Sequence, residues 1–129
     1  MPEVEPTAVA KRKVVAVIDD DSLMLQALRR LLKARGFDVR AFSTAPAFLD
    51  GDAINEVDCL VLDIGLTGMS GVELVQRMNA DGLAVPVIFI TGLNTKELRS
   101  EAMKTGCIAY LRKPFPASQL LDAIERATP

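Results

Sequence analysis

The sequence predicts an α/β fold: a doubly wound five-stranded parallel sheet with helices on both faces, in a single domain. Two observations predict it. Short apolar runs alternate five times with segments whose apolar residues recur at helical spacing, and the connections between them are short. Strands that alternate with helices form parallel sheets with right-handed crossovers. A length of 129 residues also suits one hydrophobic core.

The first strand and helix follow a tail. Residues 1–13 hold two prolines and no periodicity, and we expect them to form a flexible N-terminal tail. Residues 14–18 (VVAVI) are apolar throughout, as in a strand that is buried on both faces. Leucines at helical spacing then predict a helix over 22–36, which ends at Gly36.

The second and third strands flank a short helix. Residues 37–42 (FDVRAF) alternate in polarity and predict a shorter strand. Ser43 or Thr44 is expected to cap a short helix that runs to about Gly51. Residues 58–63 (DCLVLD) predict another buried strand.

The remaining elements repeat the alternation. Residues 70–82 carry apolar side chains at helical spacing, and 85–90 (VPVIFI) predict a strand with its proline at the start, where it is tolerated. Asn94 or Thr95 is expected to cap a helix that runs to about Gly106. The chain then closes with a strand over 107–112 and a helix over 116–128 begun by Pro116.

The composition excludes several classes of function. There is no histidine, which removes serine–histidine and cysteine–histidine catalysis and the common zinc sites. A net charge of -2 and a single short basic run, residues 11–13, predict no direct binding of nucleic acid. No apolar run approaches a membrane span and no signal peptide precedes the first strand, so a cytoplasmic location without membrane contact is expected. Cys59 and Cys107 lack a metal-binding spacing and are expected to be buried, reduced thiols.

Polar residues follow four of the five predicted strands. Asp19 and Asp20 end the first, Asp63 the third and Thr91 the fourth, and the fifth runs into Lys113. In an open parallel sheet, ligands bind outside the carboxyl ends of the strands. We therefore expect these side chains to gather at one edge.

Three carboxylates, a hydroxyl and an ammonium group suit a site for a hard cation and an anion. Carboxylate oxygens are the ligands that Mg²⁺ takes, with water and a substrate phosphate completing the octahedron. Thr91 and Lys113 supply hydrogen-bond donors for something negative. A phosphoryl group is an anion that would interact both with a cation held by the carboxylates and with the donors Thr91 and Lys113. Because histidine is absent, the nucleophile would be a carboxylate and the product an aspartyl phosphate.

The chain resembles a response regulator receiver domain of two-component signalling, in the flavodoxin-like receiver family. The resemblance runs from about Val14 to Thr128. Each motif is weak alone, but their order and spacing are specific. The motifs are Asp19-Asp20, LVLD ending at Asp63, MSGVEL, FITG with Thr91, and LRKPF with Lys113.

The resemblance implies the strand order 2-1-3-4-5 and roles for the acidic residues. Asp63 would be the phosphorylation site, taking its phosphoryl group from a phosphohistidine of a sensor histidine kinase or a histidine phosphotransfer protein. Asp20 and Asp63 would ligate Mg²⁺ directly, Asp19 through water, and Gly65 through its backbone carbonyl. The domain would be a switch that gains and loses its own phosphoryl group, not a turnover enzyme.

The resemblance also implies how phosphorylation would change the surface of the domain. Lys113 would pair with the phosphoryl oxygens, and its bond to Pro114 would be cis, as is typical of such domains. Thr91 would hydrogen-bond the phosphoryl group, and Tyr110 would turn inward as Thr91 moves. The surface of the fourth helix, fifth strand and fifth helix would then bind a partner or form a homodimer.

Alternative roles remain open for several residues. Asp20 and Asp21 are also good caps for the first helix, and the cap is the preferred role for Asp21. Met24 and Ala27 either line the core edge of that helix or form the surface on which the kinase docks. Thr67 stands four residues after Asp63, where such domains usually have proline, and is expected to loosen the loop.

Two alternative functions remain. A phosphatase of the haloacid dehalogenase type also uses an aspartate nucleophile, but it needs an acid–base aspartate at the position of Gly65. A receiver-like module that binds partners without phosphorylation is the second alternative. The complete set of Asp19, Asp20, Asp63, Thr91 and Lys113 argues against that module.

Overall fold

The computed structural model describes residues 12–93 and 95–129. The expected tail of residues 1–13 therefore lies almost wholly outside the described residues, as does Asn94, one of the two expected helix caps. In the described part, no helix is both long and apolar enough to cross a membrane.

Five parallel strands form one sheet in the order β2-β1-β3-β4-β5, which confirms the predicted fold class and order. All residues of the three central strands are buried, as their continuous apolar runs require. The edge strand β2 is half-buried along its length. The strands are β1 (Val14–Ile18), β2 (Asp38–Phe42), β3 (Cys59–Asp63), β4 (Val87–Thr91) and β5 (Ala109–Arg112).

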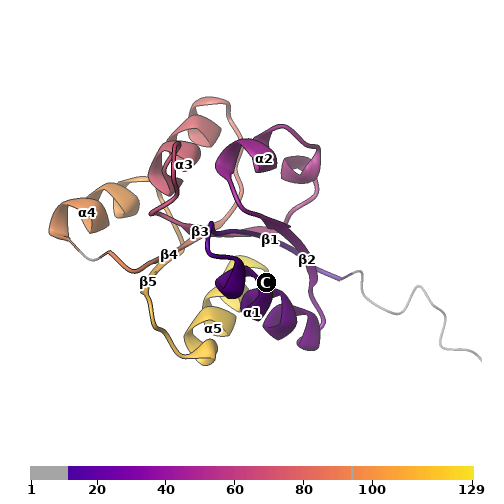
Figure 1. Cartoon of the computed structure of the whole chain (residues 1–129). Coiled ribbons are helices and arrows are strands. Elements are labelled where there is room, and N and C mark those ends of the chain that lie inside the picture. Colours follow the sequence, from indigo (N-terminus) through magenta and orange to yellow (C-terminus); the bar gives the residue numbers. More distant parts are fainter. Residues whose placement is uncertain (1–11, 94) are drawn as a thin grey trace, which may run out of the picture.

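Among the residues that the structure describes, five α-helices cover both faces of the sheet (Figure 1). Helices α2, α3 and α4 cover one face, where the core includes Phe48, Leu62 and Phe89. Helices α1 and α5 cover the other face, where the core includes Leu32 and Ile124. The helices are α1 (Ser22–Ala34), α2 (Ala45–Leu49), α3 (Gly71–Ala80), α4 (Lys96–Lys104) and α5 (Ala117–Ala127).

Helices α1 to α4 begin at polar capping residues. The carboxylate of Asp21 accepts the backbone N–H groups of Leu23 and Met24, which confirms its predicted role as the cap of α1. Thr44 caps α2 and Thr95 caps α4 through their hydroxyls. Ser70 and Glu73 cap α3 through reciprocal hydrogen bonds. Pro116 is the capping residue of α5 rather than its first residue, and its side chain makes no capping bond.

Some predicted boundaries were wrong. Strand β4 begins at Val87, not at 85, because Pro86 has no N–H and joins the sheet only through its carbonyl, which accepts Leu60 N–H at 2.9 Å. Strand β5 begins at Ala109, not at 107. A short 3-10 helix, η2 (Ala53–Asn55), was not predicted.

The two cysteines are free, as predicted. Cys59 is buried at the start of β3, and burial raises the pKa of its thiol to about 12. Cys107 is only half-buried, so the prediction of two buried thiols is wrong for this residue. Its Sγ lies 3.8 Å from Sδ of Met103 at the end of α4.

Candidate functional site

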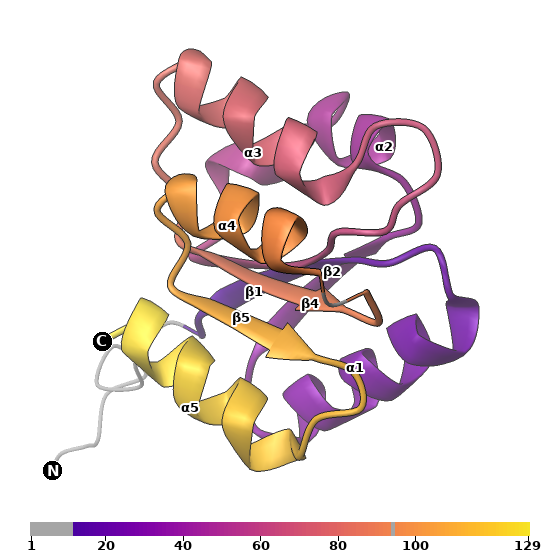
Figure 2. The same ribbon diagram turned by 90° about the vertical axis from the view of Figure 1, so that its left-hand side faces the viewer.

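The carboxyl edge of the sheet brings together the predicted acidic residues. Ile18 pairs with Leu62 across β1 and β3, so Asp19 and Asp63 follow at the same level of the sheet. One carboxylate oxygen each of Asp19, Asp20 and Asp63 lies within 4.8 Å of the other two. Figure 2 shows this edge on its right-hand side, where β5 ends and α1 begins.

The three carboxylates differ sharply in burial. Asp19 is fully buried and Asp63 is 7% exposed, whereas Asp20 is exposed. Asp19 Oδ1 accepts the backbone N–H of Asp21 at 2.9 Å, and Asp63 Oδ1 accepts that of Gly65 at 3.0 Å. The cluster therefore has a buried floor, Asp19 and Asp63, and an exposed acidic rim, Asp20.

Lys113 is the cation that faces this floor. Its Nζ lies 2.8 Å from Asp19 Oδ2 and 3.3 Å from Asp63 Oδ2. Burial alone would lower the pKa of Lys113, but the hydrogen bond with Asp19 and the charges of Asp63 and Asp19 outweigh it, so this pKa is raised. The Lys113–Pro114 peptide bond is cis, as the resemblance implied.

The charge of Asp19 is only partly compensated. Burial raises the pKa of this carboxyl group, and the hydrogen bonds from Lys113 and from the Asp21 N–H offset part of that rise. The nearby charge of Asp63 raises the pKa of Asp19 further. The cluster thus holds more negative charge than one ammonium group neutralises.

This donor set fits Mg²⁺. Three carboxylates converge, their oxygens are close enough to share one ion, and the exposed side of the cluster leaves room for water ligands. Gly65 is exposed beside Asp63, and a Cβ added there would lie 3.7 Å from Asp63 Oδ1. Glycine at this position therefore adds no side chain beside the Asp63 carboxylate.

Thr91 and Tyr110 are joined through one loop residue. Thr91 is fully buried at the end of β4, and its hydroxyl oxygen accepts the N–H of Leu93 at 2.9 Å. The Tyr110 hydroxyl donates to the Leu93 carbonyl at 3.1 Å, and the guanidinium of Arg99 lies 5.4 Å from the centre of the tyrosine ring. Burial raises the pKa of Tyr110, against the charges of Arg99 and Arg112. The loop that contains Leu93 is therefore in contact with β5, and β5 is in contact with α4.

The two predicted docking residues lie on α1, the helix that follows Asp19 and Asp20 along the chain. Met24 is half-buried and packs against the core beneath α1 and α5, whereas Ala27 is exposed. Leu23, in the first turn of the same helix, is 74% exposed. The helix thus offers an apolar exposed surface next to the acidic rim.

Two contacts of the site were not predicted from the sequence. The backbone N–H and hydroxyl of Thr67 lie 3.4 Å and 3.2 Å from Asp20 Oδ2, across 47 positions of sequence. A Cβ on Gly71 would lie 2.5 Å from the backbone oxygen of Asp63, so α3 can start this close to β3 only with glycine. The MSG motif held a signal for the second, whereas nothing in the sequence pointed to the first.

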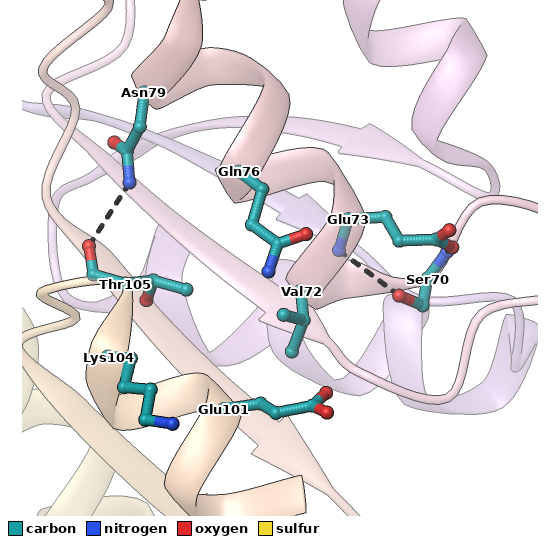
Figure 3. Close-up of a pocket in the computed structure, with 8 residues that line it drawn as sticks. All are labelled: Ser70, Val72, Glu73, Gln76, Asn79, Glu101, Lys104 and Thr105. Atoms are coloured by element: carbon teal, nitrogen blue, oxygen red, sulfur yellow. Dashed lines mark hydrogen bonds between the residues drawn. The ribbon is translucent and has the colours of Figure 1, made fainter.

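A separate polar groove of about 570 Å³ lies between α3 and α4 (Figure 3). It is bridged at one end by the Asn79 side chain, which donates to the Thr105 carbonyl at 3.2 Å. Glu101 and Lys104 of α4 face Gln76 of α3 across it. None of the predicted site residues lines this groove, so the chemistry belongs to the acidic edge.

Comparison with protein families adds an independent finding. The model of the response regulator receiver domain matches residues 15–125. Transcriptional regulatory protein FixJ of Bradyrhizobium diazoefficiens is 40% identical over 113 residues, which is 88% of this chain and 55% of that protein. The chain thus spans about half the length of the curated relatives it matches.

Solved structures agree with the fold. The response regulator StyR superposes with a TM-score of 0.84 at 40% identity, covering 92% of this chain and 60% of that one. A structure described as the BeF3-activated DrrB receiver domain superposes with a TM-score of 0.81 at 27% identity, covering 91% and 97% of the two chains.

Proposed function

Because the chain belongs to the response regulator receiver domain family, we propose that Asp63 is its phosphoacceptor. The chain is a receiver domain, a signalling switch rather than a turnover enzyme, and membership implies a cognate histidine kinase. The observation that carries the proposal is the position of Lys113, whose ammonium group lies between the carboxylates of Asp19 and Asp63. From that position the same group would neutralise phosphoryl oxygens on Asp63.

The proposed step is a transfer from a partner's phosphohistidine. An Asp63 carboxylate oxygen forms a bond to phosphorus, the phosphorus–nitrogen bond breaks, and the electron pair stays on the histidine ring, which takes up a proton. Lys113 donates hydrogen bonds to the phosphoryl oxygens. The Thr91 hydroxyl oxygen already accepts the Leu93 N–H, so its proton is available for the phosphoryl group.

We assign the exposed side of the cluster to Mg²⁺, held by Asp20 and Asp63 directly, by Asp19 through water, and by the Gly65 carbonyl. Bound there, the ion would neutralise charge on the phosphoryl oxygens during transfer. The short distances among the three carboxylates support this assignment.

The proposed output is a change of surface. Phosphorylation would shift Thr91, release the Leu93 loop and turn Tyr110, altering α4, β5 and α5 for a partner or a homodimer. Met24 and Ala27 on α1 would form part of the surface that docks a sensor histidine kinase or a histidine phosphotransfer protein. The activation of DrrB with BeF3 supports such a switch in this fold. We place this activity in the cytoplasm, without contact to nucleic acid by this chain.

Intact mass after incubation with acetyl phosphate tests the proposal. We expect one added phosphoryl group that requires both Mg²⁺ and Asp63, so Asp63→Asn should show none. Asp58→Asn, a matched change at the other end of β3, should label like wild type. Labelling of Asp63→Asn at the wild-type level would refute the assignment. No labelling of wild type under rapid quench would favour a module that binds partners without phosphorylation.

A further inference from the structure

Thr67 makes a link to the acidic rim that no motif indicates. It lies in the loop between β3 and α3, four residues after Asp63, and both its backbone N–H and its hydroxyl point at Oδ2 of Asp20. The hydroxyl contact is the shorter, at 3.2 Å against 3.4 Å. Asp20 itself follows β1, so this contact ties the β3–α3 loop to the β1–α1 loop.

The chemistry of this contact differs from what the position usually offers. Proline has neither an N–H nor a hydroxyl, so it would give Asp20 no donor. Threonine gives two donors to one oxygen of Asp20, Oδ2, and so restrains the whole carboxylate group. The expectation that Thr67 loosens this loop is therefore at odds with the contact it makes.

The burial of Asp20 explains why such a link matters. Asp19 and Asp63 are buried and held by backbone N–H groups and by Lys113. Asp20 is exposed, so packing does not fix its side-chain torsions. A carboxylate that must be ordered before it binds a cation binds it more weakly, and a hydrogen bond from outside the ligand set removes part of that cost.

We propose that Thr67 is a positioning residue for the divalent-cation site: its hydroxyl orients the Asp20 carboxylate and so strengthens Mg²⁺ binding. This inference rests on the proposed function, in which Asp20 is a metal ligand. Thr67 acts through Asp20 and takes no part in the phosphoryl transfer. A serine in its place retains the donor, and a valine retains the shape without it.

The test is a titration with Mg²⁺ alone, followed through the backbone amide NMR signals of Gly65 and Leu66. Thr67→Val should raise the dissociation constant of Mg²⁺ by about tenfold, the lower end of what loss of an outer hydrogen bond to a metal ligand causes. Thr67→Ser should stay within about twofold of wild type, because the donor remains. Thr105→Val, which removes a hydroxyl bonded to the Ala102 carbonyl far from the cluster, should leave Mg²⁺ binding unchanged.

The outcomes separate this inference from the proposed function. Wild-type affinity in Thr67→Val would overturn the role of Thr67 while leaving the cation site standing. Equal loss in Thr67→Ser and Thr67→Val would also overturn it, because the hydroxyl would then not be the cause. If Mg²⁺ does not shift the Gly65 and Leu66 signals of the wild-type protein, the cation site of the proposed function itself is contradicted.

Discussion

The aspartates at the two edges of the sheet differ in burial and in their partners. At the amino edge, Asp58 is exposed, and its carboxylate accepts the N–H of Val14 at 2.8 Å, a purely structural bond to the first strand. At the carboxyl edge, Asp19 and Asp63 are buried beside each other and share a single ammonium group. Exposed carboxylates cost little, whereas buried ones of like charge destabilise a fold.

The difference locates function without reference to any motif. A fold selected only for stability would place its acids as Asp58 is placed, in water and on a backbone donor. The carboxyl edge instead keeps charge where burial raises the pKa of Asp19, and such perturbed sites are characteristic of binding and catalysis. The energetic cost at this edge is the physical sign of the site.

Removing the shared cation should have the largest effect. In Lys113→Met, two buried carboxylates lose their partner, and we expect the free energy of unfolding without metal to fall by about 3 kcal/mol. Denaturant titration in a chelator measures this. Lys104→Met, an exposed lysine on α4, is the matched control and should change it by less than about 0.5 kcal/mol. If the two substitutions lower the free energy of unfolding equally, the buried carboxylates at the carboxyl edge do not depend on Lys113 for stability.

Crowding at the start of α3 should come next. In Gly71→Ala, the new Cβ would meet the Asp63 backbone oxygen at 2.5 Å, so β3 and α3 must separate, at a cost of about 2 kcal/mol in the free energy of unfolding. Gly51→Ala is the control, because its Cβ meets nothing closer than 3.9 Å. Thermal unfolding of both variants tests this, and a Gly71→Ala protein as stable as Gly51→Ala would contradict the close approach.

Cys59 begins the strand that Asp63 ends, and it is buried without charge. Burial raises the pKa of this thiol to about 12 in the folded state, whereas an exposed thiol in the unfolded chain has a pKa of about 9.0. The folded protein therefore binds more protons in this window, and its stability falls as pH rises. Between pH 8 and 10 this group should remove about 1.4 kcal/mol. Urea unfolding at both pH values should show a smaller decline in Cys59→Ala than in wild type; equal declines would refute it.

Neutral substitutions at the two edges should give the smallest effects, of opposite sign. Burial disfavours the charged form of Asp19, so at pH 7 Asp19→Asn should raise the free energy of unfolding without metal by about 1 kcal/mol. Asp58→Asn keeps an acceptor for Val14 but loses the charge, so it should lower stability by up to about 1 kcal/mol. Chemical unfolding in chelator compares them, and a destabilised Asp19→Asn would break the contrast between the edges.

Much of this contrast could be predicted from the sequence. Strands with parallel pairing end at one edge, so the polar residues that follow them were expected together. The structure brings Asp19, Asp20 and Asp63 into one cluster beside Lys113. The roles of these residues in phosphoryl transfer remain predictions. The prediction worked because each residue was tied to a strand end, a feature that apolar runs reveal locally.

The features that escaped prediction depend on distance through space. The contact of Thr67 with Asp20 joins two loops 47 residues apart, and no local pattern encodes it. The opposite exposure of the neighbours Asp19 and Asp20 follows from the turn of the backbone after β1, which composition does not reveal. Strand β5 was placed two residues early because Cys107 and Ile108 are apolar yet precede the regular strand.

The most direct test of the account is to locate the phosphoryl group by reduction with borohydride, which converts an aspartyl phosphate to homoserine. The protein would be treated with acetyl phosphate and Mg²⁺, reduced, digested and mapped by peptide mass spectrometry. We predict homoserine at position 63 alone, with Asp19 and Asp20 intact at the same edge and Asp58 intact at the other. Homoserine at any of those three positions, with Asp63 unmodified, would contradict the account.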